Sequence, residues 1–172
     1  MMMEVSTTNL PKVLLIKLDP FEDFRGNFVG LYNEKLYREK GVDIKFVEDD
    51  ISVSTRNVLR GIHCDSQAWK LVTCLHGKIY LVIVNCNQDS ENFGKWQSFV
   101  LSETNGLQVL APPKHGVAHL VLSDKALFHY KQSEYYDPSR QSTYRFDDPR
   151  FNIWWPIKNP ILSQRDEVGH YV

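Results

Sequence analysis

The chain has 172 residues, of which 42% are hydrophobic and 24% are charged, and these proportions are ordinary for a globular domain. The formal net charge of −1 argues against a general binder of nucleic acid or of membrane surfaces, so any anion site must be local. No apolar run is long enough for a transmembrane helix, and the segment from Met1 to Asn9 lacks the regions of a signal peptide. These features predict one domain over residues 1–172 and no membrane partner.

The three cysteines are Cys64, Cys74 and Cys86, an odd number without a CxxC spacing. Such cysteines are typical of free thiols in a reducing compartment, which predicts a cytoplasmic protein.

The first part of the chain combines a strand, a turn and a helix. Residues 13–18 are typical of a strand, and residues 23–26 (DFRG) are typical of a turn. Residues 33–40 carry the clearest helix signals, because Asn33 can cap the first turn and Gly41 can end the last one.

The rest of the chain is rich in short β-like segments. They cover residues 46–54, 71–85, 96–101, 107–110, 117–122 and 126–130. The sequence His76-Gly77-Lys78 interrupts the longest segment and predicts a hairpin there, and Asn105-Gly106 is a strong turn signal. Many short strands with a single helix favour a sandwich or barrel, with a jelly roll as a natural candidate. From Phe146 onward, proline and tryptophan predict an ordered, irregular or helical wrap.

One stretch, Asn57 to His63 (NVLRGIH), ends a β-like run with an arginine, a glycine and an isolated histidine. A lone histidine can titrate near neutral pH and move a proton. Later segments supply possible partners for it, namely Lys70, His119, Tyr130, Tyr136 and Asp166. This set suggests proton chemistry on an anionic sugar substrate without a metal.

Several motifs in register carry a family resemblance along nearly the whole chain. They are residues 23–28 (DFRGNF), 59–63 (LRGIH), 70–72 (KLV), 90–96 (SENFGKW), 113–119, 130–138, Trp155-Pro156 and 162–166 (LSQRD). Their order resembles the dTDP-4-dehydrorhamnose 3,5-epimerase family. The resemblance implies an all-β, cupin-type jelly roll with one short N-terminal helix. It also implies a homodimer that acts, without a cofactor, on a nucleotide-linked 4-keto-6-deoxy sugar.

Inverting a carbon beside a ketone requires a base on one face of the sugar and an acid on the other, with donors at the ketone oxygen. His63 suits the base, and the resemblance makes Asp166 the carboxylate behind it and Tyr130 the acid. The hydroxyl of Tyr130 could protonate the sugar from the opposite side if nearby positive charge lowers its pKa. Lys70 is the best candidate to stabilise the enolate oxygen.

Further substrate-binding positions follow from the same resemblance. Arg60 could support the enolate or grip the diphosphate, because its fork fits phosphate oxygens. The resemblance implies substrate binding by the following residues: Arg25, Phe28, His119 and Tyr136. The structural alternatives are a satisfied histidine at 63, a core tyrosine at 130, a solvated carboxylate at 166 and a salt-bridge arginine at 60.

Metal-dependent cupins carry two histidines one residue apart, then a glutamate and a later histidine. Here His63 is followed by Cys64 and Asp65, and only His63 and His119 occupy suitable positions. Two ligands are too few for a stable site, so we predict no metal.

The chain departs from the family around the expected substrate pocket. Dimeric thymidine-sugar epimerases typically have Gln and Asn near positions where this chain has Glu48 and Asp50, and Tyr-Gln where it has Cys64-Asp65. These changes favour a branch that is similar to epimerases of GDP-4-keto-6-deoxyheptoses used in bacterial capsules or lipopolysaccharide. The alternatives are a dTDP-4-dehydro-6-deoxyglucose 3,5-epimerase of dTDP-rhamnose synthesis, a sugar-nucleotide 3,4-ketoisomerase and a non-catalytic sugar-nucleotide-binding cupin.

Overall fold

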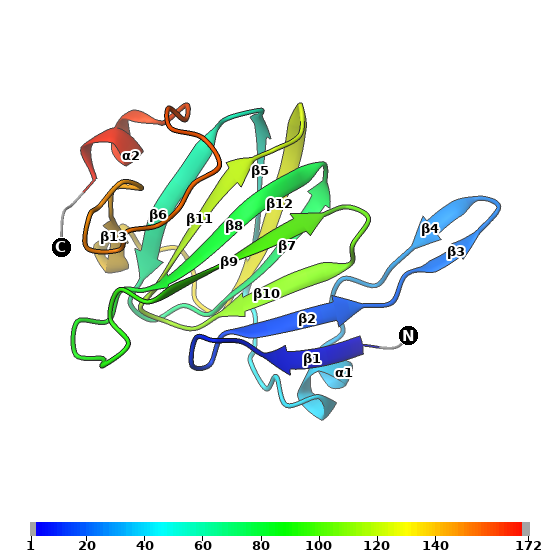
Figure 1. Cartoon of the computed structure of the whole chain (residues 1–172). Coiled ribbons are helices and arrows are strands. Elements are labelled where there is room, and N and C mark those ends of the chain that lie inside the picture. The colour runs from blue at the N-terminus through cyan, green and yellow to red at the C-terminus, as the bar shows by residue number, and fades with distance from the viewer. Residues whose placement is uncertain (1–2, 170–172) are drawn as a thin grey trace.

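Strands make up most of the regular structure in the computed structural model, which describes residues 3–169 (Figure 1). The larger sheet has the spatial order β1 (Met3–Thr7), β2 (Leu14–Leu18), β10 (Leu107–Ala111), β7 (Lys70–His76), β12 (Lys125–Gln132) and β5 (Glu48–Thr55). The smaller sheet has the order β13 (Gln141–Thr143), β6 (Leu59–Asp65), β11 (His115–Val121), β8 (Lys78–Asn85) and β9 (Trp96–Ser102). Neighbouring strands in both sheets run antiparallel, as the all-β prediction requires.

The main core lies between the two sheets. Val72 and Phe128 from the larger sheet share one buried cluster with Leu81, Leu101 and Val117 from the smaller sheet. Full burial of one such side chain contributes about 1.5–3 kcal/mol, so this layer is a major source of stability.

The outer face of the larger sheet is covered in part by α1 (Glu34–Glu39). The helix matches the predicted one, because the Asn33 side chain accepts a hydrogen bond from the Leu36 amide and Gly41 follows at φ +87°. Its Tyr37 is buried against Ile16, and the Tyr37 hydroxyl bonds to the buried Gln108 side chain. The helix therefore anchors the chain that leads into β5.

The outer face of the smaller sheet is covered by the C-terminal segment, as the sequence predicts. Phe151 and Trp155 pack on Ile62 and Val84 of β6 and β8, and the Trp155 indole donates to the Phe146 carbonyl at 2.9 Å. The segment ends in α2 (Gln164–Val168), which lies beside β6 (Figure 1). The short 3₁₀ helix η1 (Pro138–Arg140) precedes β13.

The predicted hairpin over residues 71–85 is wrong. β7 and β8 belong to different sheets, and Gly77 is the corner at which the chain crosses from one sheet to the other. Gly77 has φ +76°, and a Cβ atom there would lie 2.1 Å from the Lys125 carbonyl oxygen. Only glycine fits this corner, so the turn signal was correct and the pairing drawn from it was not.

A two-stranded hairpin, β3 (Phe21–Asp23) and β4 (Gly26–Phe28), projects away from both sheets (Figure 1). Its turn is the predicted DFRG turn, in which the Asp23 carboxylate accepts from the Arg25 backbone and guanidinium. Phe21, Phe24 and Phe28 are all exposed, and Phe24 is 99% exposed. The hairpin therefore presents apolar side chains to solvent.

Candidate active site

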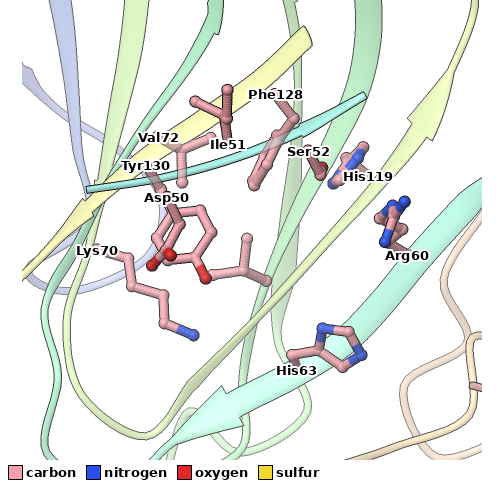
Figure 2. A pocket seen from close by; sticks show the side chains of 11 residues that line it. Asp50, Ile51, Ser52, Arg60, His63, Lys70, Val72, His119, Phe128 and Tyr130 are labelled. Atoms are coloured by element: carbon pink, nitrogen blue, oxygen red, sulfur yellow. The ribbon is translucent and has the colours of Figure 1, made fainter. Parts of the chain in front are cut away.

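A pocket of about 270 Å³ opens between the two sheets where β5 and β12 face β6 and β11 (Figure 2). Its lining includes five of the nine predicted site residues: Arg60, His63, Lys70, His119 and Tyr130. The remaining lining residues are Asp50, Ile51, Ser52, Val72, Val117 and Phe128. Its volume is close to the lower end of the usual range for ligand pockets, about 300 Å³, and suits a sugar ring better than a whole nucleotide sugar.

His63 and Asp166 form a close pair on the wall made by the smaller sheet. The Nε2 atom of His63 lies 2.6 Å from the Oδ1 atom of Asp166, which is only 2% exposed. The Ser163 hydroxyl donates to the other carboxylate oxygen at 3.0 Å and caps α2. Because Nε2 is engaged by the carboxylate, Nδ1 is the ring nitrogen of His63 that is left to move a proton in the pocket.

The Asp166 carboxyl is held in its ionised form. Burial by itself raises its pKa, but hydrogen bonds from His63, Ser163 and the Gly61 amide, together with the charge of His63, bring the pKa below the ordinary value. An ionised carboxylate behind an imidazole fixes the tautomer and stabilises the imidazolium that forms when the ring accepts a proton.

Tyr130 comes from β12 on the facing sheet, so it lies on the wall opposite His63 (Figure 2). The pKa of Tyr130 is raised, first by burial and then by the charge of Asp50 and a hydrogen bond to it. The condition of a lowered pKa is therefore not met, because burial and the charge of Asp50 both raise the pKa of Tyr130. The phenol is held in its protonated form.

Lys70 lies beside Tyr130, with its Nζ atom 5.7 Å from the centroid of the tyrosine ring. Its side chain is 8% exposed, and burial is the main cause of a lowered pKa, which the charges of Asp65 and Cys64 partly offset. A buried ammonium favours an oxyanion placed next to it.

His119 is neutral and deeply buried. Burial is the main cause that lowers its pKa to about 3, and the charge of Arg60 adds to it. Its ring stacks on Phe128 with centroids 3.9 Å apart, and its Nε2 atom has no hydrogen-bond partner within residues 3–169. The Arg60 Nε–H donates to the Ser54 hydroxyl at 2.9 Å, which fixes the guanidinium at the same end of the pocket.

Three predicted binding residues lie outside this pocket. Arg25 and Phe28 line a separate hollow on the β3–β4 hairpin. Tyr136 lies in the loop after β12, where it is 53% exposed and lines a neighbouring hollow with Arg165.

The three acidic departures from the family have different surroundings. Asp65 caps the Gln67 and Ala68 amides and bonds to Gln141, so its carboxylate is fully used within the fold. Glu48 accepts from the Gln132 side chain and from the Tyr136 amide.

Asp50 is the acidic departure that lines the pocket, and Ser52 lies beside it. From the sequence, Asp50 could bind a sugar hydroxyl or a guanine edge or could equally face solvent, and Ser52 was not singled out. Alternation along β5 is the signal that could have found both, because residues 48, 50, 52 and 54 share one face of the strand.

No three histidine, cysteine, aspartate or glutamate side chains between residues 3 and 169 converge into a possible metal cluster. Within the same residues, no helix is long and apolar enough to cross a membrane.

Comparison with known proteins agrees with this geometry. A sequence profile described as dTDP-4-dehydrorhamnose 3,5-epimerase matches residues 7–172. The dTDP-4-dehydrorhamnose 3,5-epimerase of Shigella flexneri is 37% identical over 171 residues, which are 97% of this chain and 94% of that protein.

Solved structures give the same result. A dTDP-4-dehydrorhamnose 3,5-epimerase from Bacillus anthracis, with TDP and pyrophosphate bound, has a TM-score of 0.95 and 32% identity, and the match covers 99% of this chain and 100% of that one. A dTDP-6-deoxy-D-glucose-3,5-epimerase from Legionella pneumophila in complex with dTDP-4-keto-L-rhamnose has a TM-score of 0.92 and 33% identity, covering 98% and 92%.

These matches confirm the cupin-type jelly roll and the prediction of an isomerase-class epimerase that acts on nucleotide sugars. The chain belongs to the dTDP-4-dehydrorhamnose 3,5-epimerase family.

Proposed function

We propose that this protein inverts C3 and C5 of dTDP-4-dehydro-6-deoxyglucose, the 4-keto sugar that precedes dTDP-rhamnose. The observation that carries the proposal is the placement of two proton-transfer groups on facing sheets. His63, paired with Asp166, lines one wall of the pocket, and Tyr130 lines the other. A sugar ring between them meets a base on one face and an acid on the opposite face.

In the proposed reaction, the free nitrogen of His63 removes the proton from a carbon beside the ketone. The electron pair of that C–H bond forms an enolate, and Tyr130 returns a proton to the same carbon from the other wall. Asp166 stabilises the imidazolium in between. Each centre is inverted without net oxidation or reduction, because one proton leaves and one proton arrives.

Lys70 is the proposed partner of the enolate oxygen, since its ammonium lies on the Tyr130 side of the pocket and is largely removed from water. Arg60 and His119 are proposed to bind the substrate at the other end of the pocket. The guanidinium suits the diphosphate, and the unpartnered Nε2 atom of His119 suits a hydrogen bond to a sugar or phosphate oxygen.

The nucleotide is proposed to be dTDP rather than GDP. The sequence departures favoured a GDP-4-keto-6-deoxyheptose, but the relatives reported above carry names and ligands of thymidine-linked sugars. Two of the three carboxylates behind the GDP interpretation, those of Asp65 and Glu48, are already used by the fold. Of these three carboxylates, Asp50 is the one that lines the pocket and could still favour the GDP interpretation.

We also propose a homodimer in which the β3–β4 hairpin of one copy reaches the pocket of the second. The hairpin exposes Phe24 and Phe28 and projects from the sheets (Figure 1), and a second copy would bury these rings. Arg25 and Phe28 would then contribute to a substrate site that they do not reach within one chain. Tyr136, in the loop near Tyr130, is proposed to pack on the sugar at the rim. The three free cysteines support a cytoplasmic location.

The test is NMR of dTDP-4-keto-6-deoxyglucose and of GDP-4-keto-6-deoxyheptose, each incubated with the protein in D₂O. Deuterium at C3 and C5 of the dTDP sugar supports the proposal, and deuterium at C3 alone would make the protein a single-centre epimerase. Exchange with the GDP sugar alone would restore the heptose interpretation. No carbon-bound exchange with either substrate would favour a binding cupin and overturn the proposal.

A further inference from the structure

Asp50 and Tyr130 are direct cross-strand partners in the pairing of β5 with β12. Both side chains line the pocket, and the Asp50 carboxyl raises the pKa of the Tyr130 phenol through its charge and through side-chain hydrogen bonding. Figure 2 shows the two side chains together with Lys70, on the side of the pocket away from His63. The tyrosine proposed as the acid therefore has a titratable carboxyl group, that of Asp50, next to it on the neighbouring strand.

The proximity of Asp50 affects the charge that Tyr130 can carry during the reaction. When Tyr130 gives up its proton, a phenolate forms beside Asp50, and an ionised carboxylate there would repel it. A protonated Asp50 would instead donate to the phenolate. Burial is the largest cause that raises the pKa of Asp50, and the neighbouring Glu48 and Asp49 add to it. The hydrogen bond from Tyr130 lowers it, and the net shift is upward.

We propose that Asp50 is a positioning residue that holds the hydroxyl of Tyr130 and resupplies its proton. The proposal rests on the proposed function, in which Tyr130 is the acid. The Tyr130 O–H bond breaks as the new C–H bond forms on the enolate carbon, and the Asp50 carboxyl proton passes to the phenolate oxygen. Asp50 is left as a carboxylate and regains its proton from water.

The charged and titratable groups around Asp50 are consistent with this role. Lys70 from β7 and Tyr130 from β12 face it within the larger sheet, and His63 from β6 faces it across the pocket. Glu48 and Asp49 precede it on its own strand. The ammonium of Lys70 favours ionised Asp50, whereas the two carboxylates and burial oppose its ionisation, and the net shift of the Asp50 pKa is upward.

The test compares Asp50→Asn with the matched variant Asp49→Asn one residue away. Asp49 points to the outer face, where it pairs with Lys131 at 2.7 Å and His129 at 2.9 Å. With dTDP-4-keto-6-deoxyglucose, Asp50→Asn is expected to lower kcat at least tenfold with KM within about twofold, because an amide cannot resupply a proton. It should also remove the loss of activity that wild type shows as pH rises through the pKa of Asp50. Asp49→Asn should keep kcat and the loss of activity at high pH, with that loss shifted slightly to lower pH because Asp49 raises the pKa of Asp50.

A second measurement does not depend on turnover. In protein labelled at the tyrosine ζ carbon, the Tyr130 signal is identified by its absence from Tyr130→Phe, and it should titrate at a lower pH in Asp50→Asn than in wild type. The role of Asp50 would be overturned if the Tyr130 signal titrates at the same pH in Asp50→Asn, or if that variant keeps the wild-type kcat and pH profile. Either result would leave the proposed function of the protein intact. If wild-type protein exchanges no deuterium into either nucleotide sugar, the proposed function is overturned. The proton resupply by Asp50 is then overturned as well, even if the titration shows that Asp50 contacts Tyr130.

Discussion

His63 Nε2 lies 2.6 Å from Asp166 Oδ1 across 103 residues of sequence, and α2 is the element that closes this distance. The Ser163 cap fixes the first turn of the helix and directs the Asp166 carboxylate inward, where it is almost fully buried. A buried carboxylate with this partner set orients the imidazole, so the pair can work as one proton-accepting unit.

The proposed role of His63 as the base is tested by His63→Asn. The amide side chain keeps a polar group in the pocket but cannot accept a proton from carbon, so exchange at the sugar is expected to fall by about 10²–10⁴-fold. NMR in D₂O measures the exchange, and titration calorimetry with dTDP measures binding, which should largely survive. Full exchange in a folded His63→Asn protein would remove this residue from the base role.

Asp166→Asn tests the carboxylate behind the base. Loss of the fixed tautomer should lower kcat by about 10²-fold or more, with Asp124→Asn as an exposed aspartate control that keeps activity. The folded-state pKa of Asp166 lies below its ordinary 3.8, so the ionised carboxylate stabilises the fold above that value. This stabilisation is lost as pH falls through the lowered pKa. Urea unfolding should therefore show a difference between wild type and Asp166→Asn that shrinks in acid; a pH-independent difference contradicts the assignment.

His119 predicts a second pH dependence of stability. Its ordinary pKa of 6.5 is lowered to about 3 in the fold, so between these values the unfolded chain binds a proton that the native protein does not. Stability should then decrease as pH falls from 6.5 toward 3, by at most about 1.4 kcal/mol for each pH unit. His119→Gln should unfold in urea with a shallower acid dependence. The same slope in both proteins would show that His119 does not stay neutral.

The corner between the sheets is tested by Gly77→Ala. Its positive φ and the contact of 2.1 Å with the Lys125 carbonyl predict a loss of about 3 kcal/mol or more in the free energy of unfolding. Gly41→Ala is the matched control, because Gly41 has a similar φ of +87° and no atom within 4 Å of the added Cβ. It should cost about 1–2 kcal/mol. Equal losses in urea unfolding would mean that the close contact at the corner is relieved without cost.

The sequence by itself determined the strand-rich class and the helix over residues 33–40, and it supplied the residues that are proposed for the proton transfer. These properties depend on local signals, such as the Asn33 cap, the turn residues and the order of short motifs. Local signals did not reveal β13, because its three residues, Gln141 to Thr143, have no apolar alternation and are a strand only through pairing with β6.

Only the tertiary structure decided which strands pair and which carboxylates reach the pocket. The pattern around Gly77 is the same for a hairpin and for a corner between sheets, and the choice depends on burying both faces of β7 and β8. Likewise, the sequence shows Asp50, Glu48 and Asp65 as three carboxylates with no local signal that tells their environments apart. Their partners, which come from β12, the loop after it and β13, use two of them within the fold and leave Asp50 beside Tyr130. Hydrogen-bond partners far along the chain are set by folding, so no local pattern could assign them.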